Sequence, residues 1–366
     1  MSLLLTLPII TPLIGIPICA SLKYPLFGTL TRRAAYAAVL GLTALALAAV
    51  WARGGSIAPE IHPEVGYLAM PASPLWSPLG YWAATLALFV LLIGQLTEPV
   101  RPLTADRSAQ YLIIVSATMA TVSAGNAVSF VLAWCVPQWL ITYLRVSQSE
   151  GPERMSRWDT WAGFASMALA ILGATAATSE QSGTLYLVEI GPGLAFTSFA
   201  LAAGLRLLSW PLAGGRGRWW QLHALSLVTG FFLWLRLGIA LNVESTLASY
   251  PLVTVIVGLA FGLLIGPREE ESRVVPYGFG YWLAIALLAP VLDPETGFAV
   301  SLLVGTQLML CLLVLRGYLT PHAETWTNQL PGLVAWAALS GFILTSAAVL
   351  RPLEQVGPFL DNQIMD

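Results

Sequence analysis

The sequence predicts an all-α integral membrane protein with about twelve transmembrane helices, and three observations lead to this fold class. Of the 366 residues, 57% are hydrophobic and only 10% are charged, whereas a soluble domain carries about a quarter charged residues. Apolar runs of roughly 20 residues, the length that crosses a bilayer, recur along the whole chain. The basic residues between these runs gather in alternate connections.

The apolar runs place the expected helices in order. The first run begins at Leu3 without the basic region that precedes the core of a cleavable signal peptide, so we expect it to be retained. The fourth and fifth runs are joined only by the residues from Ser123 to Asn126 and predict a tight hairpin. The twelve runs are 3–22, 34–52, 76–96, 109–124, 127–145, 159–178, 193–213, 219–241, 248–267, 275–293, 297–316 and 331–350.

The connections between these runs are ordinary loops, so we expect one polytopic domain over 1–366, whose first 74 residues supply two helices and an external loop. With alternating helices, thirteen Lys and Arg residues fall on one side and three on the other, the three being Arg53, Arg236 and Arg351. Positive residues favour cytoplasmic loops. The expected location is therefore the cell inner membrane, with both termini on the non-cytoplasmic side.

Composition and spacing also limit the chemistry. The three cysteines, Cys19, Cys135 and Cys311, are far apart in apolar runs and show neither metal-ligand spacing nor a disulfide framework. The sequence contains no nucleotide, flavin, quinone or iron–sulfur motif. A net charge of −2 does not indicate a nucleic-acid partner. We therefore expect a membrane subunit with no metal, no cofactor and no enzymatic activity of its own.

Two cationic residues interrupt the apolar stretch "GLRLLSWPLAGGRGRWWQLHALSLVTG". Arg206 lies within one run, where a charge at membrane depth costs roughly 2.5–3.5 kcal/mol and faces an interior cavity unless it snorkels to the interface. His223 follows two tryptophans, which also suits an interfacial histidine. Pro211 is expected to break the first helix and to expose backbone groups to a polar path. The residues alone leave both interpretations open.

Five stretches, in this order along the chain, carry a resemblance to a known family: "NAVSFVLAWCVPQWLITYL", "GLRLLSWPL", "LHALSLVTG", "SRVVPYGFGYW" and "TQLMLCLLVL". They resemble the antiporter-like subunits of respiratory complex I, which are shared with multisubunit cation/proton antiporters and membrane-bound hydrogenases. Relatives also occur in inorganic-carbon uptake complexes. The resemblance covers about 75–350 and implies an antiporter-like bundle with a broken helix near Pro211.

The resemblance implies a path of proton-exchanging side chains, and this chain departs from it at most positions. Cys135 stands where the family has a glutamate and Arg206 where it has the paired lysine; Gln307 and Cys311 replace a later histidine and lysine. Arginine keeps its proton in proteins, so His223 alone can exchange a proton near neutral pH. The family core has fourteen helices and a second broken helix, for which the twelve expected here offer no counterpart.

Three functions follow as alternatives. The first is an accessory or scaffold subunit of a proton- or sodium-coupled complex, held beside an intact antiporter-like homologue and a soluble catalytic subunit. The second is a subunit of an energy-coupled inorganic-carbon uptake complex with a carbonic-anhydrase-like partner. The third is a free-standing anion transporter that uses Arg206, although such transporters usually carry paired interrupted helices in two repeats. Arg206 itself would pair with a carboxylate of another subunit, bind an anion or snorkel.

The topology is testable by cysteine labelling. Ser149→Cys and Gln181→Cys flank the expected helix 159–178, so a membrane-impermeant thiol reagent should reach them from opposite sides. The unsubstituted chain, treated with the same reagent, reports the background from its own cysteines. Equal labelling of both variants from one side would rule out the twelve-helix arrangement.

Overall fold

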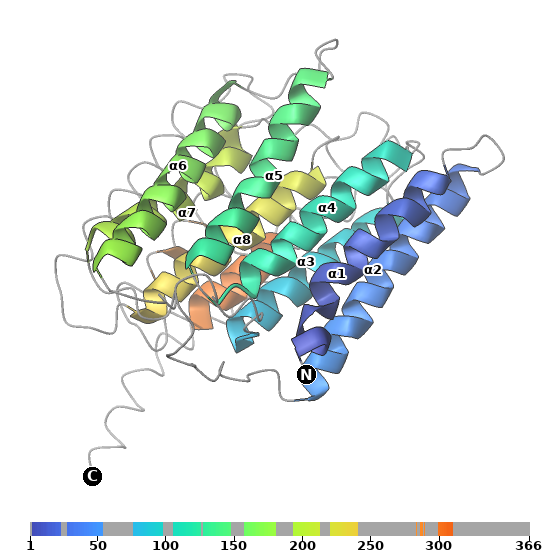
Figure 1. Ribbon diagram of the computed structural model, residues 1–366, viewed down its shortest axis with the longest axis horizontal. Helices are drawn as coiled ribbons and strands as arrows, with labels where there is room; N and C mark the ends of the chain where they lie inside the picture. The colour runs from blue at the N-terminus through green and yellow to red at the C-terminus, as the bar shows by residue number, and fades with distance from the viewer. Residues whose placement is uncertain are drawn as a thin grey trace, which may run out of the picture.

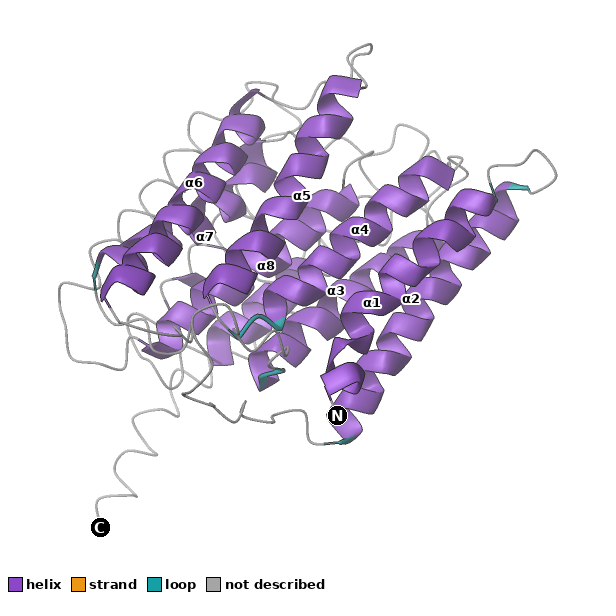
Figure 2. Cartoon of the chain, viewed as in Figure 1, coloured by secondary structure: helices purple, strands orange, loops and turns teal. Residues whose placement is uncertain are grey.

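A computed structural model of the chain describes a helical bundle (Figure 1). The described residues are 2–22, 28–53, 76–97, 105–125, 127–147, 157–180, 193–212, 220–240, 283, 286–287, 289 and 299–309. Nearly all of them are helical and none of them lies in a strand (Figure 2). The all-α class predicted from the apolar runs is therefore confirmed for this part of the chain.

Eight helices match the first eight predicted runs to within a few residues. A further helical segment, Ala299–Met309, lies within the predicted run 297–316. The predicted helices 248–267 and 331–350 lie outside the described residues. The eight are α1 (Ser2–Ser21), α2 (Thr29–Ala52), α3 (Pro78–Thr97), α4 (Ala105–Val122), α5 (Ala127–Ser147), α6 (Arg157–Glu180), α7 (Leu194–Leu212) and α8 (Trp220–Ala240).

Several arginines that were counted with the connections lie within helices, among them Arg33, Arg107 and Arg157. Arg32, predicted to be in a loop, belongs to α2, and its Nε donates a hydrogen bond to the Leu22 carbonyl oxygen at 2.9 Å. Arg236, assigned to a non-cytoplasmic connection, lies inside α8 and is buried. Counting it with a connection was wrong, since the predicted run 219–241 already contains it and α8 spans that run. Without Arg236, the count is thirteen basic residues on the expected cytoplasmic side and two on the other side.

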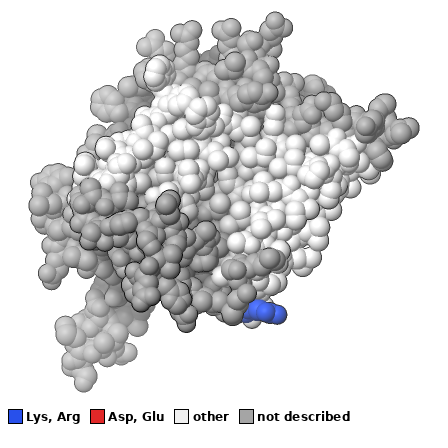
Figure 3. Space-filling model, in the orientation of Figure 1, with Lys and Arg blue, Asp and Glu red and all other residues white. Residues whose placement is uncertain are grey.

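Within the described ranges, two segments are long and apolar enough to cross a membrane, Leu4–Ser21 and Leu30–Ala52. Only 28% and 33% of them, respectively, are buried inside the protein. Large apolar side chains such as Ile14 and Leu45 are 59% and 67% exposed, and the described residues visible in Figure 3 carry almost no charge. The other apolar helices are shorter by the same measure, so the twelve-helix count remains a prediction.

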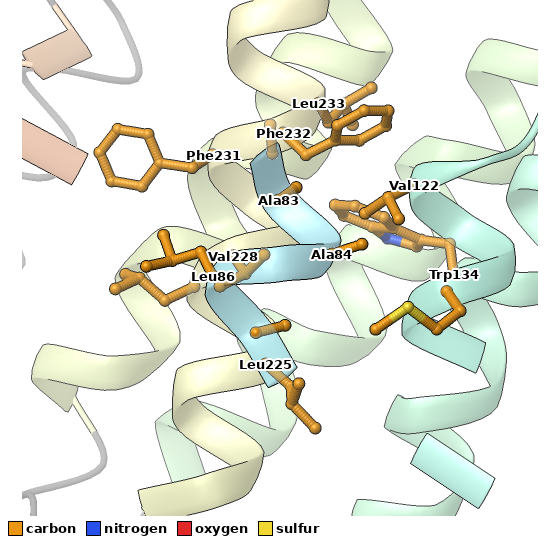
Figure 4. Close-up of a cluster of buried hydrophobic side chains, with 14 of the residues drawn as sticks. Ala83, Ala84, Leu86, Val122, Trp134, Leu225, Val228, Phe231, Phe232 and Leu233 are labelled. Atoms are coloured by element: carbon orange, nitrogen blue, oxygen red, sulfur yellow. The ribbon is translucent and has the colours of Figure 1, made fainter. Parts of the chain in front are cut away.

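α8 is the central element of the bundle. It packs against α3, α4, α5 and α7, and every residue from Ala224 to Leu237 is buried. A helix that is apolar all round is expected at such a position. Its large side chains, including Phe231 and Phe232, share a core with the small Ala83 and Ala84 of α3, which permit close helix approach (Figure 4).

The α3–α4 contact gives a stability prediction. A Cβ added to Gly80 would lie 2.6 Å from the backbone oxygen of Val122, so Gly80→Ala must push α3 away from α4. We expect it to destabilise the fold by about 1–3 kcal/mol, measured as a lower thermal midpoint in detergent. Gly41→Ala is the matched control, since no atom lies within 4 Å of its added Cβ. A Gly80→Ala variant as stable as the Gly41→Ala variant would contradict the packing.

Candidate functional site

Arg206 of α7 lies inside the bundle and joins three helices. Its side chain is 5% exposed. Nη2 donates a hydrogen bond to the Trp134 carbonyl oxygen of α5 at 2.7 Å, and Nη1 lies 3.5 Å from the Thr229 hydroxyl of α8. Cζ is also 3.8 Å from the centroid of the Trp134 ring, a cation–π contact. The guanidinium therefore has both a polar and an aromatic partner in the same residue.

The depth of this contact decides between two interpretations of Arg206. Trp134 and Thr229 lie near the middle of α5 and α8, so the guanidinium points to the middle of these helices. A snorkelling arginine extends instead towards the end of its helix, where water begins. Because Arg206 is buried against α5 and α8, snorkelling does not account for it.

The sequence of α5 places a proline close to this contact. Pro137 has no N–H, so the Ala133 carbonyl oxygen lacks its usual helical donor. The bond from Arg206 goes to the next carbonyl, that of Trp134. Pro137 therefore lies one turn beyond the acceptor and does not by itself free it.

Trp134 also connects the site to α6. This side chain is fully buried, and its Nε1 donates to the Ser166 hydroxyl at 3.2 Å. Ser166 in turn donates to the Ala202 carbonyl oxygen of α7 at 2.7 Å. Phe130 packs on the same indole, with 5.1 Å between ring centroids. The polar atoms of this buried cluster are thus hydrogen-bonded, as burial requires.

Cys135 lies at the same site. It follows Trp134 directly, is a half-buried free thiol, and is close enough to Arg206 for an electrostatic interaction. The positions where the family has its glutamate and lysine are therefore neighbours in space, although 72 residues separate Arg206 from Trp134. Among the residues that the structure describes, no group of three His, Cys, Asp or Glu side chains is placed to hold a metal ion.

The structure places the other predicted site residues apart from this cluster or leaves them undescribed. His223 lies in the first turn of α8 and Pro211 in the last turn of α7, but their side chains are outside the described part, as is the whole of Cys311. Gln307 is half-buried in the segment 299–309. Its neighbour Thr306 accepts a hydrogen bond from Trp82 of α3 at 3.1 Å, so this helical segment packs beside α3.

A second buried arginine was missed from the sequence. Arg236 is 5% exposed, its Nη1 donates to the Ala124 carbonyl oxygen at 3.3 Å, and its Cζ is 5.6 Å from the Phe232 ring centroid. It stands inside an apolar run just as Arg206 does. The same rule, that a charge within a run marks an interior site, would have found it.

Comparison with known proteins adds no relative. No protein-family model matches the chain, and no curated protein sequence matches it. The resemblance to antiporter-like subunits therefore depends on the five sequence stretches alone.

The role of Trp134 can be tested within one helix. Trp134→Phe removes the Nε1 hydrogen bond to Ser166 and part of the ring beneath Arg206, so we expect a loss of about 1–3 kcal/mol in folding stability. Trp139→Phe is the matched control, because Trp139 is 66% exposed on the same helix and should change stability by less than about 0.5 kcal/mol. Thermal unfolding in detergent measures both. Equal midpoints for the two variants would show that the indole does not hold the cluster together.

Proposed function

We propose that this chain is a non-catalytic accessory subunit of a proton- or sodium-coupled membrane complex related to complex I. In this proposal it spans the cell inner membrane twelve times, with both termini on the non-cytoplasmic side. The observation that carries the proposal is the contact of Arg206 with the Trp134 carbonyl, directly beside Cys135. The sequence resemblance assigns a proton-exchanging pair to these same positions, and here neither member supplies one.

The grouping of the aligned residues supports the family part of the proposal. Trp134 and Cys135 come from the stretch that resembles the fifth helix of the family, Arg206 from the broken-helix stretch, and Thr229 from the stretch that follows it. Hydrogen bonds join residues of all three stretches. Three separate motifs would meet in this way if they formed one ion path in an ancestral bundle.

The chemistry of Arg206 and Cys135 supports the proposal that the chain does not itself move protons. A transported proton must be taken up and given back by each group on its path. Arginine keeps its proton, and the Arg206 guanidinium is held by a carbonyl, a hydroxyl and an indole ring. Cys135 supplies no carboxylate, and Gln307 has no proton to exchange. The cluster therefore acts as a fixed cation that fastens α5, α7 and α8 together.

The surface of the bundle suits a subunit in lipid with protein neighbours. α5 exposes Leu132 and Trp139, each to 66%, and α6 exposes Trp161 to 69%. Tryptophan is favoured at membrane interfaces and in protein contacts. The proposed partners are an intact antiporter-like homologue, the surrounding lipid and a soluble catalytic subunit.

Two measurements on the same tagged preparation test the proposal. Extraction in mild detergent should recover the chain with a homologous subunit that retains its glutamate and lysines. The chain alone in liposomes should give no proton or sodium flux above empty liposomes under a membrane potential, because Arg206 cannot release its proton. A chain recovered without partners would contradict the subunit role, and flux that His223→Ala abolishes would show a working transporter.

A further inference from the structure

The tryptophans whose side chains the structure describes fall into two groups. Three of them, Trp51, Trp139 and Trp161, are 71%, 66% and 69% exposed, and none of these indoles is hydrogen-bonded within the described part of the chain. The other four pack within the bundle, and each donates its indole N–H to another part of the chain: Trp76 to the Leu5 carbonyl oxygen, Trp82 to the Thr306 hydroxyl, Trp134 to the Ser166 hydroxyl and Trp234 to the Leu287 carbonyl oxygen. An indole is a large apolar ring with a single donor. The three exposed indoles therefore suit a place where an apolar layer meets hydrogen-bond acceptors.

Two of these exposed indoles lie at one level of the bundle. The contacts between α5 and α6 show that the two helices run antiparallel. A Cβ added to Gly163 of α6 would lie 2.0 Å from Nε2 of Gln138 in α5, so these two residues are level with each other. Trp139 follows Gln138 directly and Trp161 precedes Gly163 by two residues. Trp139 and Trp161 thus share a level on the side where α5 ends and α6 begins.

Trp51 lies at the opposite end of the bundle. It is in the last turn of α2, on the side where α1 begins, because α1 and α2 form a hairpin. α4 runs antiparallel to α1, since Ser116 bonds to the Ile9 carbonyl oxygen and Leu112 lies beside Gly15. α5 follows α4 through a tight turn and runs back. The end of α2 and the end of α5 are therefore on opposite sides (Figure 1).

The exposed residues of α2, α5 and α6 follow the same order from the helix end inwards. An arginine comes first, then the exposed tryptophan, then an exposed leucine: Arg53, Trp51 and Leu45 in and after α2; Arg145, Trp139 and Leu132 in α5; Arg157, Trp161 and Leu172 in α6. Basic residues, aromatic rings and aliphatic side chains succeed one another in this order across a membrane boundary. A protein partner docked on one side of the bundle would not require the same order at both ends.

We propose that Trp51, Trp139 and Trp161 anchor the chain in the two interfacial layers of a phospholipid bilayer, where each indole N–H donates to an ester or phosphate oxygen of a lipid. Such oxygens are acceptors, which complement a group that can only donate. The inference rests on the proposed placement in a membrane and adds a depth to it. Trp134 precedes Trp139 by five residues, which is about 7.5 Å along α5, so the contact with Arg206 lies below the interface.

Tryptophan fluorescence of the purified full-length chain in phosphatidylcholine vesicles tests these anchors. The lipid carries bromine, which quenches a nearby indole, either close to the headgroup or close to the bilayer centre. The fluorescence lost in Trp51→Phe, Trp139→Phe or Trp161→Phe should be the part that bromine close to the headgroup quenches more strongly. It should also emit at a longer wavelength than the remainder, because the indole lies in a polar layer. Trp234→Phe is the matched control, since Trp234 is 1% exposed and its fluorescence should respond to bromine at neither depth.

Stronger quenching of these three indoles by bromine at the bilayer centre would overturn the proposal. Quenching at neither depth would also overturn it, because protein would then cover the indoles. In both cases the membrane placement stands if the whole chain still responds to brominated lipid. A whole chain that responds to no brominated lipid would instead refute the membrane placement itself. Because the three side chains are exposed, each variant is expected to fold.

Discussion

The contact between Arg206 and Trp134 is the interaction on which the arrangement of α5 to α8 depends. A guanidinium inside an apolar bundle must find several partners at once, and this one finds a carbonyl, a ring and a hydroxyl on two neighbouring helices. The indole N–H of Trp134 donates a hydrogen bond to the Ser166 hydroxyl of α6, and this hydroxyl donates to the Ala202 carbonyl oxygen of α7. Because apolar side chains pack with little directional preference, such polar contacts are what fix the rotation of each helix.

The surrounding helices are built to allow this contact. Gly230 of α8 lies where a Cβ would meet the Leu207 side chain at 3.0 Å, so α7 and α8 approach closely beside Thr229. Pro137 lies one turn after Trp134, whose carbonyl oxygen in α5 accepts the bond from Arg206. The burial of α8 on all sides means that any charge on it must be satisfied by protein or by a bound ion. Close helix contacts and a buried central helix together limit where cations are tolerated.

The sequence predicted the helices better than it predicted the site. Length and hydropathy located α1 to α8 because a run of roughly 20 apolar residues has few other folds. They began the second helix after Arg32 because a charge was taken as a boundary, although α2 begins earlier, at Thr29. No pattern within α7 shows that Arg206 meets Trp134, since the acceptor is a backbone carbonyl oxygen of a different helix. The resemblance alone indicated that the two stretches would meet.

An arginine beside a cysteine has a different effect on a bundle from a lysine beside a glutamate. A lysine–glutamate pair is neutral in total and can change its charge by moving one proton. Arg206 and its neutral partners keep a net positive charge at all times, because a carbonyl, a hydroxyl and an indole supply only dipoles. Arg236 adds a second fixed charge, held by weaker contacts. Such an interior repels a passing cation rather than relaying it, which is the physical reason for proposing a non-catalytic role.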